Sequence, residues 1–100
     1  MIKDIRHKIF ECRLLIGQRR LMSSLANRLI NVSEVARRNG FHVYEFEANL
    51  ELAKFWILSG QSQLVIGHLN EIDYLARLAA DHYTLKIIGL YQIAAHIIKV

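Results

Sequence analysis

The sequence predicts an all-α protein in which antiparallel helical hairpins stack as a short right-handed α-solenoid. Three observations lead to this fold class. The chain has no proline and only five glycines, so little interrupts long helices and β-hairpin turn pairs are missing. Apolar residues recur at steps of three and four, and the apolar pattern repeats after about 43 residues. With 53% hydrophobic and 22% charged residues, we expect residues 1–100 to form a single folded domain.

Glycines divide the chain into helical segments. Gly17, Gly40 and Gly60, with a further break near residues 81–83, predict helices at about residues 2–16, 18–38, 42–59, 62–80 and 84–99. Each of the first, second and fourth segments has one apolar stripe, which is typical of a helix with one buried face. The stripes are Ile2, Ile5, Ile9, Cys12 and Ile16; Leu21, Leu25, Leu29, Val32 and Ala36; and Leu64, Leu69, Ile72, Leu75 and Ala79.

The stripes repeat along the chain. A shift of about 43 residues places Leu21 on Leu64 and Leu29 on Ile72, and a similar shift places Ala53 on Ala95. A repeat of this length, one helical hairpin long, is typical of α-solenoids. We therefore predict one repeat over about residues 2–40, a second over about 41–82, and a half repeat over 83–100.

The segment from Leu52 to Gly60, together with the apolar positions that follow it, resembles the first helix, turn and second helix of a tetratricopeptide-type repeat. These positions are Val65, Leu69, Ile72, Leu75 and Ala76. In particular, the chain resembles the long degenerate repeats of maltose-type bacterial transcriptional activators over nearly its whole length. Ala53 matches the small residue that the family places early in the first helix, whereas Phe10 replaces it in the first repeat, and the closing proline is absent. The resemblance implies a bacterial, cytoplasmic protein-binding adaptor with a regulatory role, for instance in transcription.

The resemblance also implies a groove along the first helix of each hairpin. On these helices the acids Glu11, Glu47 and Glu51 would repel a peptide carboxylate. The alternative is an ordinary solvated face, with Glu51 and Lys54 as a simple pair three residues apart. The predicted groove residues are His7, Lys8, Glu11, Glu47, Leu50, Glu51, Lys54, Gln92 and His96.

The last predicted helix is apolar around nearly its whole circumference. An end helix of a repeat array normally has a polar outer face, so we expect another surface to cover this one. A homodimer is the leading interpretation, and a different protein partner or a longer repeat array are the alternatives. The predicted self-association residues are Leu85, Ile88, Tyr91, Ile93, Ile97 and Ile98.

Basic residues concentrate in the first part of the chain. Residues 1–40 hold nine Lys or Arg against three acids, which would steer an acidic partner. A nucleic-acid-associated regulator is the alternative function, with a basic patch on the second predicted helix. It is weakened because a recognition helix after Gly40 would present Glu45, Glu47 and Glu51 to phosphate. The patch residues are Arg19, Arg20, Arg28, Arg37 and Arg38.

The sequence shows no pattern of catalytic or metal-binding residues. The five histidines form no pair four residues apart, and no phosphate-binding glycine loop is present, so we expect no metal and no cofactor. Cys12, the only cysteine, is expected to be a buried apolar residue in a reducing cytosol, and no membrane span is predicted. We do not expect an enzyme, although Arg6, Arg13 and Arg20 weakly resemble the anion-binding set of small all-helical chorismate mutases.

Overall fold

The protein is all-helical, which confirms the predicted fold class. A computed structural model describes residues 2–98, apart from the side chains of Ser62 and Ile98. Within these residues the chain forms five α-helices and no strand. The helices are α1 (Ile2–Gly17), α2 (Ser23–Arg38), α3 (His42–Leu58), α4 (Ser62–Leu78) and α5 (His82–Ile98).

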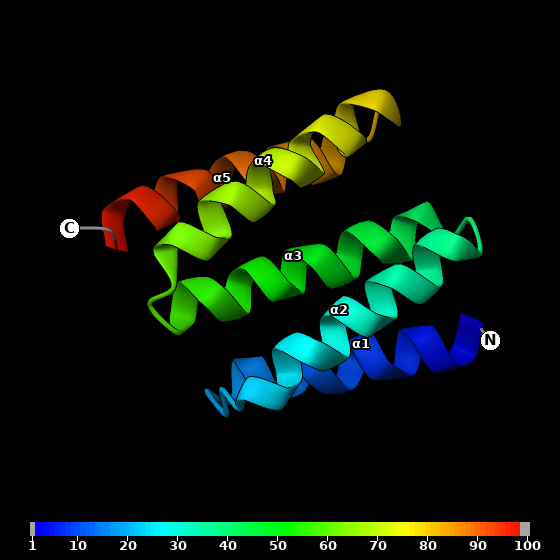
Figure 1. The fold of residues 1–100 in the computed structure, drawn as a ribbon, viewed down its shortest axis with the longest axis horizontal. Helices are drawn as coiled ribbons and strands as arrows, with labels where there is room; N and C mark the ends of the chain where they lie inside the picture. The colour runs from blue at the N-terminus through cyan, green and yellow to red at the C-terminus, as the bar shows by residue number, and fades with distance from the viewer. Residues whose placement is uncertain (1, 99–100) are drawn as a thin grey trace.

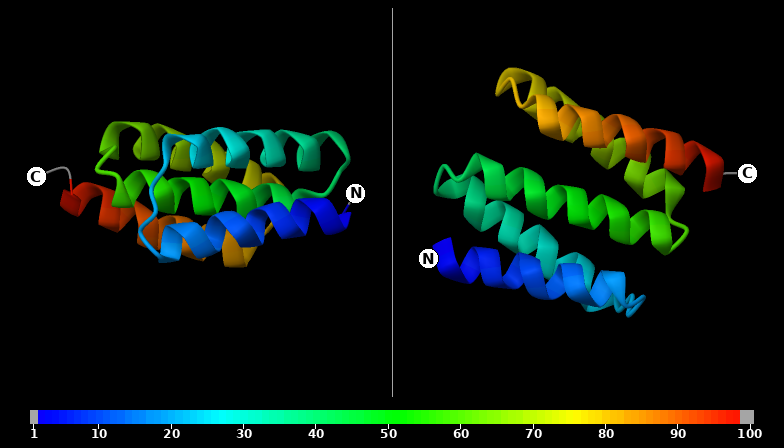
Figure 2. Two further views of the ribbon diagram at one scale, coloured as in Figure 1. Left: turned by 90° about the horizontal axis from the view of Figure 1, so that it is seen from below. Right: turned by 180° about the vertical axis from the view of Figure 1, so that it is seen from behind.

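The helices form two layers (Figure 1). Helices α1, α3 and α5 run in the same direction and lie side by side, as the view from behind shows (Figure 2). Helices α2 and α4 run the opposite way on the other side of α3. α3 contacts all four other helices, whereas no pair of Cα atoms from α2 and α4, or from α1 and α5, comes within 8 Å. α3 is therefore the element that joins the two ends of the stack.

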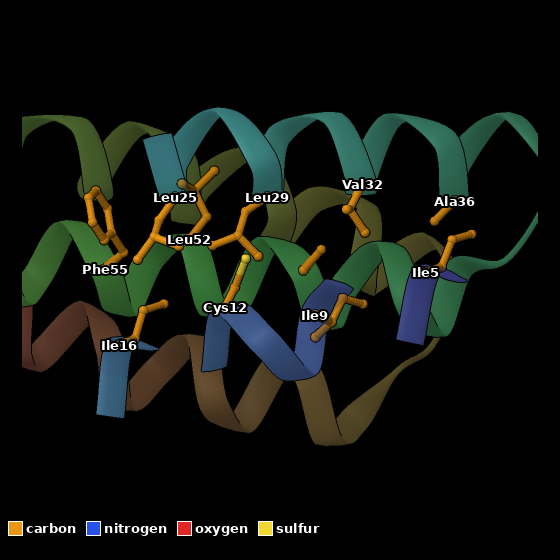
Figure 3. Close-up of a cluster of buried hydrophobic side chains, with 11 residues drawn as sticks. Ile5, Ile9, Cys12, Ile16, Leu25, Leu29, Val32, Ala36, Leu52 and Phe55 are labelled. Atoms are coloured by element: carbon orange, nitrogen blue, oxygen red, sulfur yellow. The ribbon is translucent and has the colours of Figure 1, made fainter. Parts of the chain in front are cut away.

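Two clusters of buried apolar side chains hold the layers together. The first lies between α1, α2 and α3 (Figure 3), and the second lies between α3, α4 and α5. α3 contributes Leu52 and Phe55 to the first cluster and Phe46 and Leu50 to the second. Because both sides of α3 are buried, this helix lacks the single apolar stripe of an ordinary surface helix.

The predicted stripes of α1 and α2 are confirmed, except that Ile2 is exposed and Leu21 is only partly buried. In α4 the buried stripe differs from the prediction: Leu64 and Ala79 are exposed and Leu75 is only partly buried, whereas Val65 and Ala76 are buried. The fully buried positions of α2 recur in α4 forty residues later. Leu25, Leu29, Val32 and Ala36 in α2 correspond to Val65, Leu69, Ile72 and Ala76 in α4.

The structural repeat is thus about three residues shorter than the predicted one of about 43 residues. The two spacings differ by nearly one helical turn of 3.6 residues, so both match apolar positions on the same helix face. The sequence alone therefore detects the repeat but does not fix its register.

The turns between helices share one backbone geometry. A residue in the left-handed region follows each of the first four helices: Arg19 (φ 61°), Gly40 (φ 75°), Gly60 (φ 75°) and Ala80 (φ 53°). After each, the next backbone N–H donates to the carbonyl five residues earlier, as from Phe41 to Ala36 at 2.8 Å. This bond closes the helix end in a Schellman motif.

Two of the predicted boundaries that differ from the structure have clear local causes. Gly17 is the last residue of α1, and the left-handed residue is Arg19, so α2 begins at Ser23 and not near residue 18. α5 begins at His82, two residues earlier than predicted, because Asp81 caps it: its Oδ1 accepts the Thr84 N–H at 3.0 Å. The predicted end of the last helix at residue 99 lies outside the described residues.

The left-handed turn at Ala80 gives the first testable prediction. A residue with a Cβ is strained at positive φ, whereas glycine is not, so Ala80→Gly should raise the free energy of unfolding by about 0.5–1 kcal/mol. Urea denaturation followed by circular dichroism measures the change. The neighbouring Ala79 has φ −86°, so Ala79→Gly should leave stability unchanged or lower it. Equal effects of the two substitutions would contradict the assignment of strain to Ala80.

Candidate interaction surfaces

The outward side of α5 carries an exposed apolar stripe. Leu90 is 56% exposed, Ile93 61% and Ile97 68%. Their spacing of three and four residues places them on one face of the helix. Exposed aliphatic side chains in one row, as opposed to scattered ones, are typical of a surface that binds another protein. We call this row the α5 stripe.

The repeat gives the α5 stripe a specific structural equivalent. The fully buried Ile88 of α5 corresponds to Ala48 of α3, forty residues earlier, which is also fully buried. In the same register, the α5 stripe corresponds to the side of α3 that packs on α4 and α5. In this register Leu90, Ile93 and Ile97 correspond to Leu50, Ala53 and Ile57 of α3, respectively. The α5 stripe is therefore the repeat's own helix-packing face, left without a neighbour among the described residues.

The predicted self-association residues divide between this stripe and the core. Ile93 and Ile97 lie on the α5 stripe, but Ile88 is fully buried and belongs to the core, so its assignment to the surface is corrected. Ile88→Glu would disrupt the core and would not test self-association. Leu85 and Tyr91 are partly buried against the same core, and the Ile98 side chain lies outside the described atoms. Leu90 was not predicted, because only the register shows which side of α5 faces α3.

A second surface lies where α1 meets α3. Arg13 of α1 donates through Nε to Glu51 Oε1 at 2.9 Å and through Nη2 to Glu47 Oε1 at 3.2 Å. The hydrogen bond to Glu51 is the main cause that raises the pKa of Arg13. The Glu51 side chain is only 9% exposed, and its Oε2 is buried without a hydrogen bond, 4.0 Å from Lys54 Nζ. Two of the three acids expected to repel a carboxylate, Glu47 and Glu51, are therefore already paired with a cation.

The other predicted groove residues do not form one continuous groove. His7 pairs with Glu11 on α1 at 2.8 Å, and Lys8 lines hollows between α1 and α2. Leu50 is buried in the core, which corrects its assignment to the groove. On α5, Gln92 is partly buried and His96 is exposed.

An open cavity of ≈ 550 Å³ lies between α1 and the first turns of α3. Of its lining residues, only His7 and Glu47 belong to the predicted groove. The sequence did not indicate the other lining residues, because the cavity depends on how α1 crosses α3. Its lining is Lys3, Arg6, His7, Ile9, Phe10, Arg13, Val43, Tyr44 and Glu47. We call it the α1–α3 cavity.

A smaller cavity of ≈ 260 Å³ lies between α2 and α4, with α3 below it, and was not predicted. His68 of α4 lies edge-on to Trp56 of α3, with ring centroids 5.0 Å apart. The Nε2–H of His68 donates to the Asn49 carbonyl at 3.1 Å, which fixes its tautomer because a carbonyl only accepts. Burial lowers the pKa of His68 below 6.5.

The five arginines of the predicted basic patch do not converge. Arg19 and Arg20 lie in the turn before α2, and Arg28 lines a hollow toward α1. Arg37 lines the cavity toward α4, whereas Arg38 pairs with Glu34 at 3.4 Å. No single phosphate-binding face results from these positions.

Within residues 2–98, no group of three or more His, Cys, Asp or Glu side chains is arranged to hold a metal ion. Cys12 is 1% exposed, and burial is the main cause that raises its pKa, so it behaves as a core residue and not as an activated thiol. None of the helices in this range is both long and apolar enough to cross a membrane.

The Arg13–Glu51 pair gives the second testable prediction. Arg13→Met leaves Glu51 buried without its cation, and the free energy of unfolding should fall by about 1–3 kcal/mol, moderated by the partial exposure of Arg13. Urea denaturation measures the loss. Adding Glu51→Leu to the Arg13→Met variant should recover most of the lost free energy of unfolding. Arg77→Met, which breaks the exposed Arg77–Asp73 pair, is the control and should change little. An equal loss in both single variants would contradict a special role for Glu51.

The burial of His68 gives the third prediction. Because its folded-state pKa lies below its unfolded value of 6.5, the unfolded chain binds the proton more strongly. Stability should therefore be complete above pH 6.5 and should fall as the pH drops toward the folded-state pKa. His68→Gln should flatten this dependence in denaturation curves measured across that range, whereas His96→Gln, at an exposed site, should retain it. Retention of the full slope in His68→Gln would contradict the assignment.

Comparison with known proteins adds no assignment. No family model matches the chain, and neither a curated protein nor a solved structure matches it. The tetratricopeptide-type resemblance therefore stays a prediction, and a functional proposal rests on the surfaces described above.

Proposed function

We propose that this chain is a non-catalytic protein-binding module, cytoplasmic and regulatory in setting, that self-associates through the α5 stripe. The observation that carries the proposal is the register of Leu90, Ile93 and Ile97. They occupy the positions that, on α3, are packed against the next two helices. A helix is the natural cover for such a face, because the same fold already packs helices on its equivalent.

The two ends of the stack favour a second copy in a symmetric arrangement. Asp4, Lys8 and Glu11 of α1 line hollows toward α2, outside the α1–α3 cavity, and a bare apolar row packed on them would remove these charged groups from water. A head-to-tail contact is therefore disfavoured. Pairing α5 with α5 of a second copy instead places apolar residues against apolar residues, as a two-fold dimer requires.

The energetics support a dimer of modest affinity. Each residue of the α5 stripe is more than half exposed, so pairing two copies removes six such side chains from water. Fully burying one aliphatic side chain contributes about 1.5–3 kcal/mol, and these side chains are already partly buried. Association itself costs about 4–15 kcal/mol, so a dimer forms only where this cost is near its lower limit, and we expect a dissociation constant of tens of micromolar.

The fourth prediction tests this interface. Sedimentation of the intact chain at about 10–100 μM, a range that brackets a dissociation constant of tens of micromolar, should show a dimer. Ile93→Glu should convert it to a monomer, because the carboxylate would be buried in the interface. Leu14→Glu makes the same kind of change at an exposed aliphatic residue of α1, and this control should remain dimeric. A wild-type chain that sediments as a monomer throughout this range would overturn self-association.

A further inference from the structure

The α1–α3 cavity has an excess of positive charge that its geometry leaves unneutralised. Three cationic side chains line it, Lys3, Arg6 and Arg13, against one carboxylate, Glu47. Arg13 pairs with Glu47 at 3.2 Å and with Glu51 at 2.9 Å, and Lys54 lies 4.0 Å from Glu51, so these two cations and two carboxylates offset one another. Lys3 and Arg6 are exposed and form no ion pair within residues 2–98. The free charge of the cavity wall is therefore positive.

The amino end of α3 adds to this potential. Val43 and Tyr44 of its first turns line the cavity, and the N-cap residue Phe41 provides no side-chain hydrogen bond to the turn. The first N–H groups of a helix carry partial positive charge. Glu45, the acid of that turn, offsets part of this charge, although its side chain lines the cavity between α2 and α4 on the other side of α3.

The cavity also has apolar walls. Phe10 of α1 and Val43 of α3 are both more than half exposed, and the buried Ile9 lies between the charged residues of α1. An aromatic side chain beside a guanidinium is the kind of surface at which one anchoring side chain of a partner gains most of its binding energy. The lining thus combines a cationic rim with an apolar contact area.

We propose that the α1–α3 cavity binds an acidic segment of a protein partner that carries one large apolar side chain. The carboxylates would face Lys3 and Arg6, and the apolar side chain would contact Phe10 and Val43. Charge complementarity of this kind favours one class of partner and accelerates its encounter. Glu47 and Glu51 share the cations Arg13 and Lys54, which reduces the repulsion that these acids were expected to exert.

This site is independent of the α5 stripe. The Cα atoms of α1 and α5 do not come within 8 Å of each other, and the cavity lies between α1 and α3, away from the outward side of α5. A dimer formed through α5 would leave both copies of the cavity open. The arginines of α2, which a nucleic acid would need as further phosphate contacts, lie on other faces and do not extend the cavity rim. An acidic protein segment therefore fits the cavity better than a nucleic acid does.

The experiment uses the full chain and a short fluorescent peptide of Asp and Glu with one central Phe, followed by anisotropy at low and high salt. Binding should weaken with salt, because the rim charges are exposed. Arg6→Glu and Phe10→Ala should each weaken binding by about tenfold or more. Lys8→Glu makes a similar charge reversal on the other side of α1 and should weaken it by less than about threefold.

A peptide with Asn and Gln in place of the acids should bind at least about tenfold more weakly, since it lacks the charges that the rim attracts. The proposal is overturned if the wild-type chain does not bind the acidic peptide, or if Arg6→Glu and Lys8→Glu weaken peptide binding equally. It is also overturned if duplex DNA displaces the peptide and its own binding depends on Arg6, since the occupant would then be a nucleic acid. If the peptide does not bind but the chain still sediments as a dimer, only the binding proposal for the α1–α3 cavity is contradicted, and the proposed self-association through the α5 stripe is not.

Discussion

The packing of α3 against four other helices is the constraint on which the rest of the molecule depends. A helix surrounded in this way must be apolar on opposite sides, and small residues such as Ala48 and Ala53, both fully buried, let neighbouring backbones approach it closely. Its polar groups must then be satisfied locally. Glu51 meets this demand by accepting a hydrogen bond from Arg13 of α1, and the Asn49 side-chain amide does so by donating to the Glu45 carbonyl.

The comparison of α3 with α5 connects this constraint to function. Both helices hold the same place in their repeats, and both are apolar on more than one side. α3 has neighbours on each of those sides, whereas the Leu90, Ile93 and Ile97 side of α5 has none among the described residues. Apolar residues on more than one side allow α3 to form the centre of the stack. On α5 the same pattern leaves one apolar side exposed, and covering that side with a helix would lower the free energy.

Part of this structure could be predicted from the sequence because it depends on local patterns. The spacing of apolar residues located the five helices, and Gly40 and Gly60 located two turns, since both adopt the positive φ that glycine tolerates. Arg19 and Ala80 adopt the same geometry without being glycine, so their turns were placed less well. The binding surfaces depend on contacts between helices, such as Arg13 with Glu51, which no spacing within one helix reveals.

The separation of α2 from α4 gives the molecule a mechanical property. No Cα atoms of α2 and α4, or of α1 and α5, come within 8 Å of each other, so the two ends of the stack are joined through α3. The Trp56–His68 contact links α3 to α4, and the Arg13–Glu51 pair links α3 to α1. A force that pulls the two ends apart would therefore be transmitted through α3, and both of these interactions lie on its path.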